Sequence, residues 1–186
     1  MFKHIGNYDV TNIASCVDSL TKEQWTKWRE LQELYKSGDS TMTYCLSWCM
    51  PGSGDVYKVV VHDNSSDLAK ACEPLTNRLT DFYKSKPIAV GFNRLLERRN
   101  IPPHTDAMYE GIHRIHIPIR TNQLVFVMDG RNVLHHWRRG GVYQLDATKS
   151  HGIVNASRLD RVHLVIDIPS QQFIKPIEYE VKPSSL

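Results

Sequence analysis

The sequence predicts a mainly β protein with flanking helices, and two observations carry this prediction. From Pro87 onward, seven segments of strand length follow one another, separated by short groups of turn residues. The first half of the chain, by contrast, mixes helical and strand patterns. We therefore expect one domain over residues 1–186, in which a mixed α/β portion (1–86) packs on a barrel core (87–170) that is followed by a tail (171–186).

Two helices are predicted in the N-terminal portion. Thr21 has the character of an N-cap because Gln24 follows three residues later, and Gly38 is a plausible end of that helix. The apolar residues of this helix, which recur at three-to-four spacing, are Trp25, Trp28, Leu31, Leu34 and Tyr35. The second helix spans Ser66 to Tyr83, with Pro74 as a start, kink or break. Its expected apolar side consists of Leu68, Ala71, Cys72, Leu75, Leu79 and Phe82.

Strand patterns fill most of the remaining chain. Thr43–Trp48 and Val56–His62 are rich in Val, Tyr and Trp, and Pro51–Gly54 forms the turn between them. The strands expected after Pro87 are Ile88–Leu96, Ile115–Arg120, Leu124–Met128, Val133–Arg138, Val142–Leu145, Gly152–Asn155 and Val162–Ile168. Many short strands at regular spacing indicate a sandwich or barrel. A jelly roll of the cupin kind is the natural choice, because it closes its edges and leaves a mouth for a ligand.

Composition places the chain among ordinary globular proteins. A net charge of +3 is too small to argue for a nucleic-acid partner by itself. No segment approaches the roughly 20 apolar residues that a membrane span needs, and the first residues lack the apolar core of a signal peptide. None of the four cysteines forms a C-x2-C pair, so we expect reduced thiols, a cytoplasmic location and no membrane partner.

Three residues have the types and spacing of a metal site. His104 and Asp106 stand two apart after a pair of prolines, and in extended backbone such side chains point the same way. His151 lies far downstream, between two predicted strands. Two histidines and one carboxylate form the facial triad that binds iron(II). Three ligands on one face leave three positions open, two for a chelating oxoacid and one for O2.

Two further segments carry charge into apolar strands. Arg161 opens the strand Val162–Ile168 and needs a partner there. The far carboxylate of 2-oxoglutarate suits its planar guanidinium, and the alternative partner is Asp160. Arg114 and His116 alternate with isoleucines and therefore share one strand face. The alternation alone leaves open whether that face meets solvent or the pocket.

Taken together, these motifs resemble the aspartyl/asparaginyl beta-hydroxylase family and its bacterial relatives that hydroxylate free proline. The matching segments are His104–Asp106, Arg114–Ile119, Trp137–Asp146, Ser150–Asn155 and Asp160–Asp167. The resemblance implies a double-stranded β-helix in which His104 and His151 bind iron and Arg161 holds the remote carboxylate of 2-oxoglutarate. It also implies cosubstrate contacts from Arg114 and His116, which favours the pocket for their face, and a small polar contact from Asn93.

The chain departs from the animal beta-hydroxylases at one ligand. Those enzymes have glycine at the position of Asp106 and lack the carboxylate ligand, whereas the proline hydroxylases have an aspartate there. The aspartate supports a complete three-ligand site, and it weakens any transfer of substrate from the animal enzymes. Residues 1–85 match no family that we can name, so the substrate stays open.

The sequence thus predicts an Fe(II)- and 2-oxoglutarate-dependent dioxygenase. Its substrate would be an amino acid, a peptide side chain or a related small molecule, hydroxylated at a C–H bond with succinate and CO2 as coproducts. One alternative is an oxygen-independent metal-binding cupin, either an isomerase or a small-molecule binding protein, which has no need of Arg161. Another is a nucleic-acid base oxygenase with basic and aromatic groups around Arg94, Arg98–Arg99 and His135–Arg139. We interpret these clusters as solvated strand ends or loops, so nucleic acid is the less favoured partner.

Overall fold

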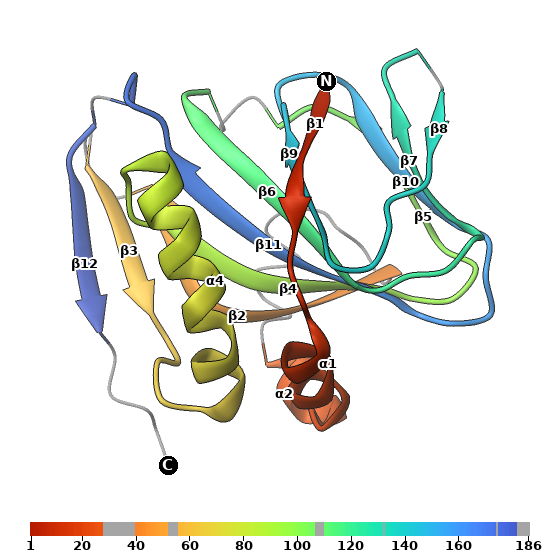
Figure 1. The fold of residues 1–186 in the computed structure, drawn as a ribbon, viewed down its shortest axis with the longest axis horizontal. Helices are drawn as coiled ribbons and strands as arrows, with labels where there is room; N and C mark the ends of the chain where they lie inside the picture. Colours follow the sequence, from red (N-terminus) through yellow and green to blue (C-terminus); the bar gives the residue numbers. More distant parts are fainter. Residues whose placement is uncertain (28–39, 52–55, 107–109, 132, 174, 182–186) are drawn as a thin grey trace.

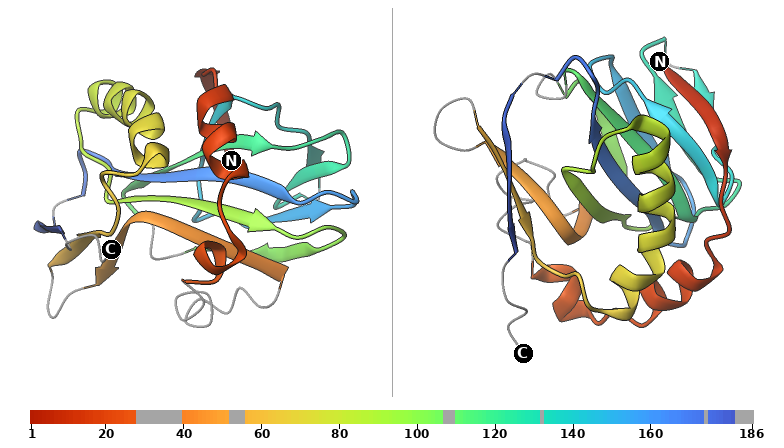
Figure 2. Two further views of the ribbon diagram at one scale, coloured as in Figure 1. Left: turned by 90° about the horizontal axis from the view of Figure 1, so that it is seen from below. Right: turned by 60° about the vertical axis from the view of Figure 1, so that its left-hand side comes forward.

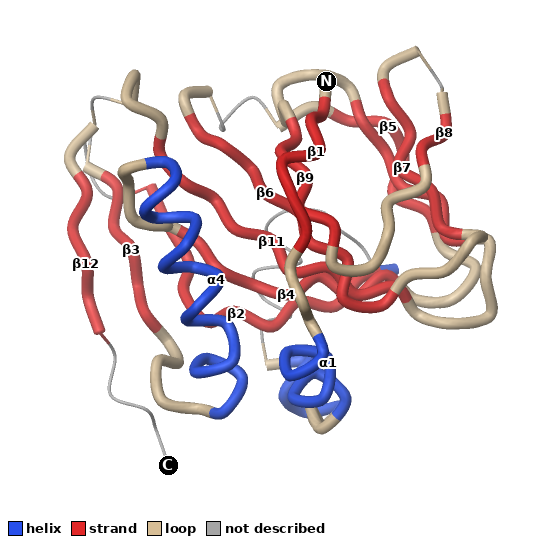
Figure 3. The backbone as a smooth tube through the Cα atoms, in the orientation of Figure 1, coloured by secondary structure: helices blue, strands red, loops and turns tan. Residues whose placement is uncertain are grey.

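The computed structural model describes residues 1–27, 40–51, 56–106, 110–131, 133–173 and 175–181. Strands dominate it, and they form one sheet of eight strands and one of four (Figures 1 and 3). The helices and N-terminal strands are β1 (Phe2–Asn7), α1 (Thr11–Asp18), α2 (Lys22–Thr26), β2 (Thr41–Pro51), β3 (Tyr57–Val61) and α4 (Asp67–Tyr83). The remaining strands are β4 (Ala89–Leu95), β5 (Asn100–His104), β6 (Ile112–Arg120), β7 (Val125–Asp129), β8 (Leu134–His135), β9 (Gly141–Leu145), β10 (His151–Asn155), β11 (Arg161–Pro169) and β12 (Ile177–Val181).

The order of the strands defines a double-stranded β-helix. The large sheet runs β1-β9-β6-β11-β4-β2-β3-β12, and the small sheet runs β5-β10-β7-β8. Along the chain, β4, β6, β9 and β11 enter the large sheet, while β5, β7, β8 and β10 enter the small one. The chain therefore winds between two facing sheets, which confirms the jelly roll predicted from the run of short strands.

The helices cover one face of the large sheet. α1 and α4 lie side by side over its central strands, on the side away from the small sheet (Figure 2). The alternate residues Val162, Leu164, Ile166 and Ile168 of β11 are buried in the core on that side. Ile115, Ile117 and Ile119 of β6 belong to the same core. Because successive side chains alternate across a strand, Arg114 and His116 lie on the opposite face, toward the small sheet.

Local signals predicted the starts of two of the three described helices, whereas α1 (Thr11–Asp18) was not predicted from the sequence. Thr21 and Gln24 form the predicted capping box, and Trp25 is buried. The rest of that predicted helix, including Trp28 and Gly38, lies outside the described residues. Ser66 caps α4 through the backbone N–H of Ala69, and Pro74 lies inside the helix without splitting it.

Phe82 was wrongly assigned to the apolar side of the second helix. Its side chain is 66% exposed, whereas Leu68, Cys72, Leu75 and Leu79 are buried as predicted. The physical reason is that Tyr83, four residues after the buried Leu79, packs against the core in its place, while the ring of Phe82 lies edge-on to Tyr83 (4.9 Å between centroids).

Both ends of the chain contribute strands that the sequence did not reveal. β1 pairs antiparallel with β9, and β12 lies within the expected C-terminal tail and pairs in parallel with β3. These pairings join segments far apart in the sequence, so no local turn signal announces them. β8 is also shorter than expected, because only Leu134 and His135 of the segment Val133–Arg138 pair with β7. Within the described part of the chain, no helix is long and apolar enough to cross a membrane.

Asn155 anchors the turn that leads into β11. Its side chain is fully buried; Nδ2 donates to the carbonyl oxygens of Leu96 (3.0 Å) and Leu159 (2.9 Å), and Oδ1 accepts from Ser157 Oγ (2.7 Å). The turn is thereby tied to the end of β4, and this fixes the position of Arg161 at the start of β11.

We expect Asn155→Ala to lower the free energy of unfolding by about 2–3 kcal/mol, because several buried polar groups lose their partner together. Urea denaturation measures the loss. Asn122→Ala is the matched control, because that side chain accepts one hydrogen bond from Leu124 N in an exposed turn. Equal losses in the two variants would contradict an anchoring role for Asn155.

Candidate metal centre

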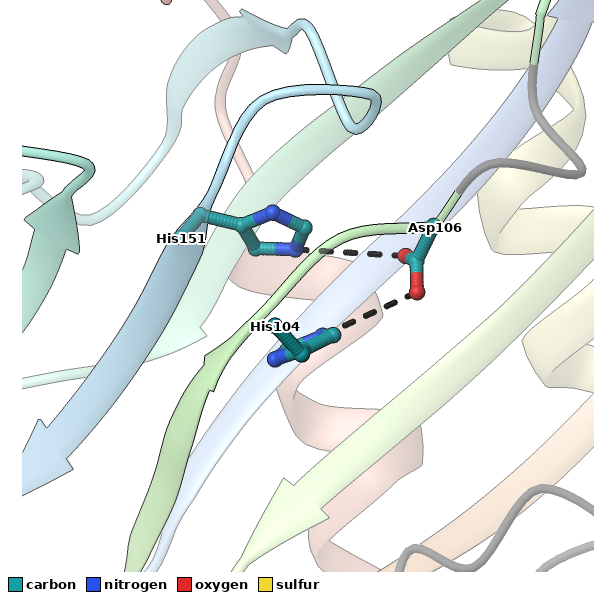
Figure 4. A group of neighbouring side chains, drawn as sticks. All are labelled: His104, Asp106 and His151. Carbon is teal, nitrogen blue, oxygen red and sulfur yellow. Dashed lines mark ion pairs between the residues drawn. The ribbon is translucent and has the colours of Figure 1, made fainter.

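His104, Asp106 and His151 meet where β5 ends and β10 begins. His104 and His151 are Cα partners in the antiparallel pairing of these strands. Asp106 follows two residues after His104, and its backbone N–H donates to the carbonyl oxygen of Ala147 (2.8 Å). One potential ligand atom from each residue lies within 4.8 Å of the others, and the two imidazoles point toward the carboxylate (Figure 4). The structure thus brings together the three residues that the sequence singled out.

Backbone carbonyls orient both imidazoles. His104 Nδ1 lies 2.8 Å from the carbonyl oxygen of Pro102, and His151 Nδ1 lies 2.9 Å from that of Lys149. Because a carbonyl oxygen can only accept, the proton sits on Nδ1, and the lone pair of each Nε2 is available to a metal. These Nε2 atoms lie 3.7 Å and 3.9 Å from carboxylate oxygens of Asp106.

The donor set suits a divalent transition metal. Burial lowers the pKa of His151, and the neighbouring His104 adds to this effect, so the ring is neutral at pH 7 as a ligand must be. Two neutral imidazoles and one carboxylate form the two-histidine, one-carboxylate set typical of non-haem iron(II). The residues present therefore fit such an ion.

Arg114 connects this cluster to the large sheet. Its Nε and Nη2 donate to the two oxygens of Asp167 (2.9 Å and 3.0 Å), and its Nη1 donates to Asp106 Oδ2 (2.7 Å). Asp167 is buried on β11. In this structure the guanidinium therefore contacts two protein carboxylates, and the cosubstrate contact implied by the resemblance stays a prediction.

Arg161 is a buried cation. Its side chain is 1% exposed, its Nη2 donates to His163 Nδ1 at 2.5 Å, and its Nε has no hydrogen-bond partner. Asp160, the alternative partner, instead accepts a hydrogen bond from Arg94 Nε (2.7 Å), so a salt bridge between Arg161 and Asp160 is the wrong interpretation. Burial lowers the pKa of Arg161 to about 9, which still leaves it charged at neutral pH. Among the described residues no carboxylate forms an ion pair with it, so the site calls for an anion.

Several buried nitrogens in this region, including one of Arg161 itself, have no hydrogen-bond partner. They are both ring nitrogens of His116, Nε2 of His163, Nε1 of Trp137 and Nε of Arg161. The three rings lie with their centroids 5.6–6.0 Å apart. Burial, followed by the charges of Arg161, Arg114 and His151, lowers the pKa of His116 well below its usual value. Because buried polar groups are normally paired, this interior fits a ligand rich in oxygen atoms, as 2-oxoglutarate is.

His163 and Trp137 were not recognised as site residues from the sequence. His163 had a usable signal, because it stands two residues after Arg161 and so shares its strand face. Trp137 lies between β8 and β9, where no periodicity applies, and its ring stacks on Tyr143 at 4.6 Å. Asn93 is the Cα partner of His163, and its Oδ1 accepts from Thr43 Oγ1 at 3.2 Å. Asn93 thus lies beside the unpaired nitrogens.

The buried histidines predict acid sensitivity of the metal-free protein. Burial and the nearby Arg161 charge hold the pKa of His163 well below its usual 6.5. The unfolded chain therefore binds a proton that the folded chain does not, so stability is full above about pH 6.5 and falls as the pH drops below it. Each such group contributes a slope of up to about 1.4 kcal/mol per pH unit.

We expect His163→Gln to make the free energy of unfolding less dependent on pH below about 6.5, by up to about 1.4 kcal/mol per pH unit. Urea denaturation at several pH values between 7 and 5, in the presence of a chelator, measures it. His136→Gln, at an exposed histidine, is the control and should keep the wild-type slope. An unchanged slope in His163→Gln would show that His163 is protonated in the folded protein.

Comparisons with known proteins agree with this architecture. The profile of the family described as aspartyl/asparaginyl beta-hydroxylase matches residues 4–171, so it includes most of residues 1–85, for which the sequence motifs had indicated no family. Among solved structures, an oxidoreductase of the 2OG-Fe(II) oxygenase family from Burkholderia pseudomallei is 13% identical, with a TM-score of 0.53, 88% of this chain and 91% of that chain covered. The viral collagen prolyl hydroxylase from Paramecium Bursaria Chlorella virus-1, in its 2OG complex, is 8% identical, with a TM-score of 0.58. The match covers 92% of this chain and 96% of the viral enzyme. NgTET1 in complex with 5mC DNA is 15% identical, with a TM-score of 0.53, and the match covers 88% of this chain and 74% of NgTET1. At these identities the structural matches show a shared fold.

Proposed function

Because the chain belongs to the aspartyl/asparaginyl beta-hydroxylase family of 2-oxoglutarate-dependent dioxygenases, we propose that it hydroxylates a C–H bond of an amino acid, a peptide side chain or a related small molecule. Fe(II), 2-oxoglutarate and O2 are the cofactors of this chemistry, and succinate and CO2 would be the coproducts. The observation that carries the proposal is the pairing of two features. One is a two-histidine, one-carboxylate cluster in which His151 is buried and His104 is exposed, and the other is a buried guanidinium that has no carboxylate partner among the described residues.

Each residue has a role that follows from its surroundings. His104, Asp106 and His151 would hold the iron, which when bound supplies activation of O2. Arg161 would bind the remote carboxylate of 2-oxoglutarate, since a buried cation and a dicarboxylate compensate each other. His116 has both ring nitrogens buried without a hydrogen-bond partner, so it is a candidate contact for the same molecule. Asn93, the Cα partner of His163, is a second candidate from the resemblance.

The alternative functions receive less support. An oxygen-independent cupin does not explain Arg161 and does not agree with the family. The clusters that suggested a nucleic-acid partner are partly occupied within the protein: Arg94 pairs with Asp160, and Trp137 is buried against Tyr143. The similarity to NgTET1 is one of fold. An amino-acid or peptide substrate therefore remains our proposal, and a low-salt gel shift with DNA and RNA would test the other.

A cytoplasmic location is also proposed, on the evidence of the thiols. All four cysteines are free, and burial raises the pKa of Cys45 and Cys72 to about 12, which keeps both as thiols. Free cysteines are typical of a reducing compartment. Cell fractionation with antibody detection would test this.

The direct test of the proposed function is spectroscopic. Fe(II) and 2-oxoglutarate are added to the purified protein without oxygen, and we expect the weak visible charge-transfer band of a chelated 2-oxoacid. Admission of O2 should then convert 2-oxoglutarate to succinate, slowly without substrate and faster with it. Absence of the band, with metal binding confirmed independently, would reject the proposal in favour of a metal-binding protein that does not use 2-oxoglutarate.

A further inference from the structure

The side chain of Asp106 has fewer hydrogen bonds to the backbone than the side chains of His104 and His151. The histidines lie on strands β5 and β10, and a carbonyl oxygen fixes each ring through Nδ1. Asp106 lies two residues beyond the end of β5, and its carboxylate accepts no backbone hydrogen bond within the described chain. A side chain must therefore set the direction of this carboxylate, and among the described residues Arg114 donates a hydrogen bond to it.

Arg114 is itself held in place by Asp167 on the neighbouring strand. Arg114 and Asp167 are Cα partners on the adjacent strands β6 and β11, at the centre of the large sheet. The Nε and Nη2 of Arg114 engage both oxygens of Asp167, and this two-point contact fixes the plane of the guanidinium. Nη1 is then directed at Asp106 Oδ2 at 2.7 Å. Lysine could not replace this arrangement, because a single ammonium offers no rigid fork.

The combined charge of Arg114, Asp106 and Asp167 also favours binding of a divalent cation. Arg114 carries one positive charge, while Asp106 and Asp167 carry one negative charge each, so the three groups together remain negative. Without Asp167, the guanidinium would cancel the charge of Asp106 and oppose metal binding. Asp167 therefore serves to anchor the arginine and to offset its charge, although it does not touch the metal cluster itself.

We propose that Arg114 is a positioning residue for the carboxylate of Asp106 and that Asp167 is its anchor, an inference that rests on the metal site of the proposed function. It differs from the role that the resemblance gives Arg114, which is to contact the cosubstrate. The two roles separate experimentally, because one acts on the affinity for the metal alone and the other on the affinity for 2-oxoglutarate once metal is bound.

The test is titration of the metal-free protein with Mn(II) or Co(II), which needs no turnover. We expect Arg114→Lys and Asp167→Asn to weaken metal binding by about 10–100-fold, the usual effect of losing a group that orients a ligand. Once saturated with metal, both variants should bind 2-oxoglutarate as the wild type does. The matched controls are Arg94→Lys and Asp160→Asn, because Arg94 on β4 of the same sheet pairs with Asp160, just before β11, outside the metal cluster. These controls should keep wild-type metal affinity.

A double variant separates positioning from folding. Single changes leave a buried charge without its partner and can unfold the protein. Arg114→Met combined with Asp167→Leu removes both charges at once, so we expect a cooperative thermal transition like that of the wild type, and metal binding that is still weakened at least 10-fold. A folded double variant with wild-type metal affinity would overturn the inference.

Two further outcomes would distinguish the positioning role from a cosubstrate contact and from a failure of the proposed function. Unchanged metal affinity in Arg114→Lys, with a raised dissociation constant for 2-oxoglutarate, would make Arg114 a cosubstrate contact and overturn the positioning role. If the wild-type protein itself bound no divalent metal, the proposed function would fail first and the positioning role with it. The wild-type titration therefore distinguishes the two failures.

Discussion

His104→Ala should abolish Fe(II) binding and, with it, the charge-transfer band of the 2-oxoglutarate complex. His104 supplies one of three ligand atoms, and two protein ligands cannot hold the ion on one face with a defined set of open positions. Loss of a ligand should exceed the 10–100-fold effect of losing a group that only orients one, so we expect metal affinity to fall by more than about 100-fold. Turnover should fall to background for the same reason.

The fold should survive this substitution. The His104 side chain is 39% exposed at the end of β5, and its ring makes one hydrogen bond, to the neighbouring Pro102 carbonyl. Circular dichroism and thermal unfolding of the metal-free variant should therefore match the wild type. His136→Ala is the matched control, because His136 is an exposed histidine bonded to the carbonyl of Val125. Persistence of the band in His104→Ala would remove His104 from the metal site.

The metal cluster could be predicted from sequence because its geometry is largely local. His104 and Asp106 are two residues apart in extended chain, so their proximity needs no knowledge of the fold. His151 stood out as a histidine between two predicted strands that completes the set of ligands, and Arg161 because a charge that opens an apolar strand needs a partner. The barrel core was predictable for a similar reason, since strand length and turn residues are local properties.

What the sequence could not provide is register. Arg114 meets Asp167 because β6 and β11 pair with a particular alignment, and nothing in either segment specifies that alignment. The same holds for the pairing of β12 with β3. These contacts depend on non-local pairing, so they appear only once the whole sheet is assembled.

Arg161→Met should have two opposite effects, and together they would identify a binding residue. Loss of the guanidinium should weaken 2-oxoglutarate binding by roughly 2–5 kcal/mol, which is at least about 30-fold in the dissociation constant. In the absence of cosubstrate, however, the wild-type protein carries a fully buried cation that no described carboxylate neutralises. Methionine fills similar space without charge, so the metal-free variant should be more stable than the wild type.

The measurement combines urea denaturation of the metal-free proteins with titration of 2-oxoglutarate into the metal-bound ones. Arg120→Met is the control, because Arg120 is an exposed arginine paired with Asp18 at the end of β6. It should leave both quantities close to wild type, since exposed ion pairs contribute about 0–1 kcal/mol. A less stable Arg161→Met variant with unchanged 2-oxoglutarate affinity would mean that the cation has a structural partner within the protein. A more stable variant that no longer binds 2-oxoglutarate would mean that the folded protein tolerates a destabilising buried charge in order to bind its dicarboxylate.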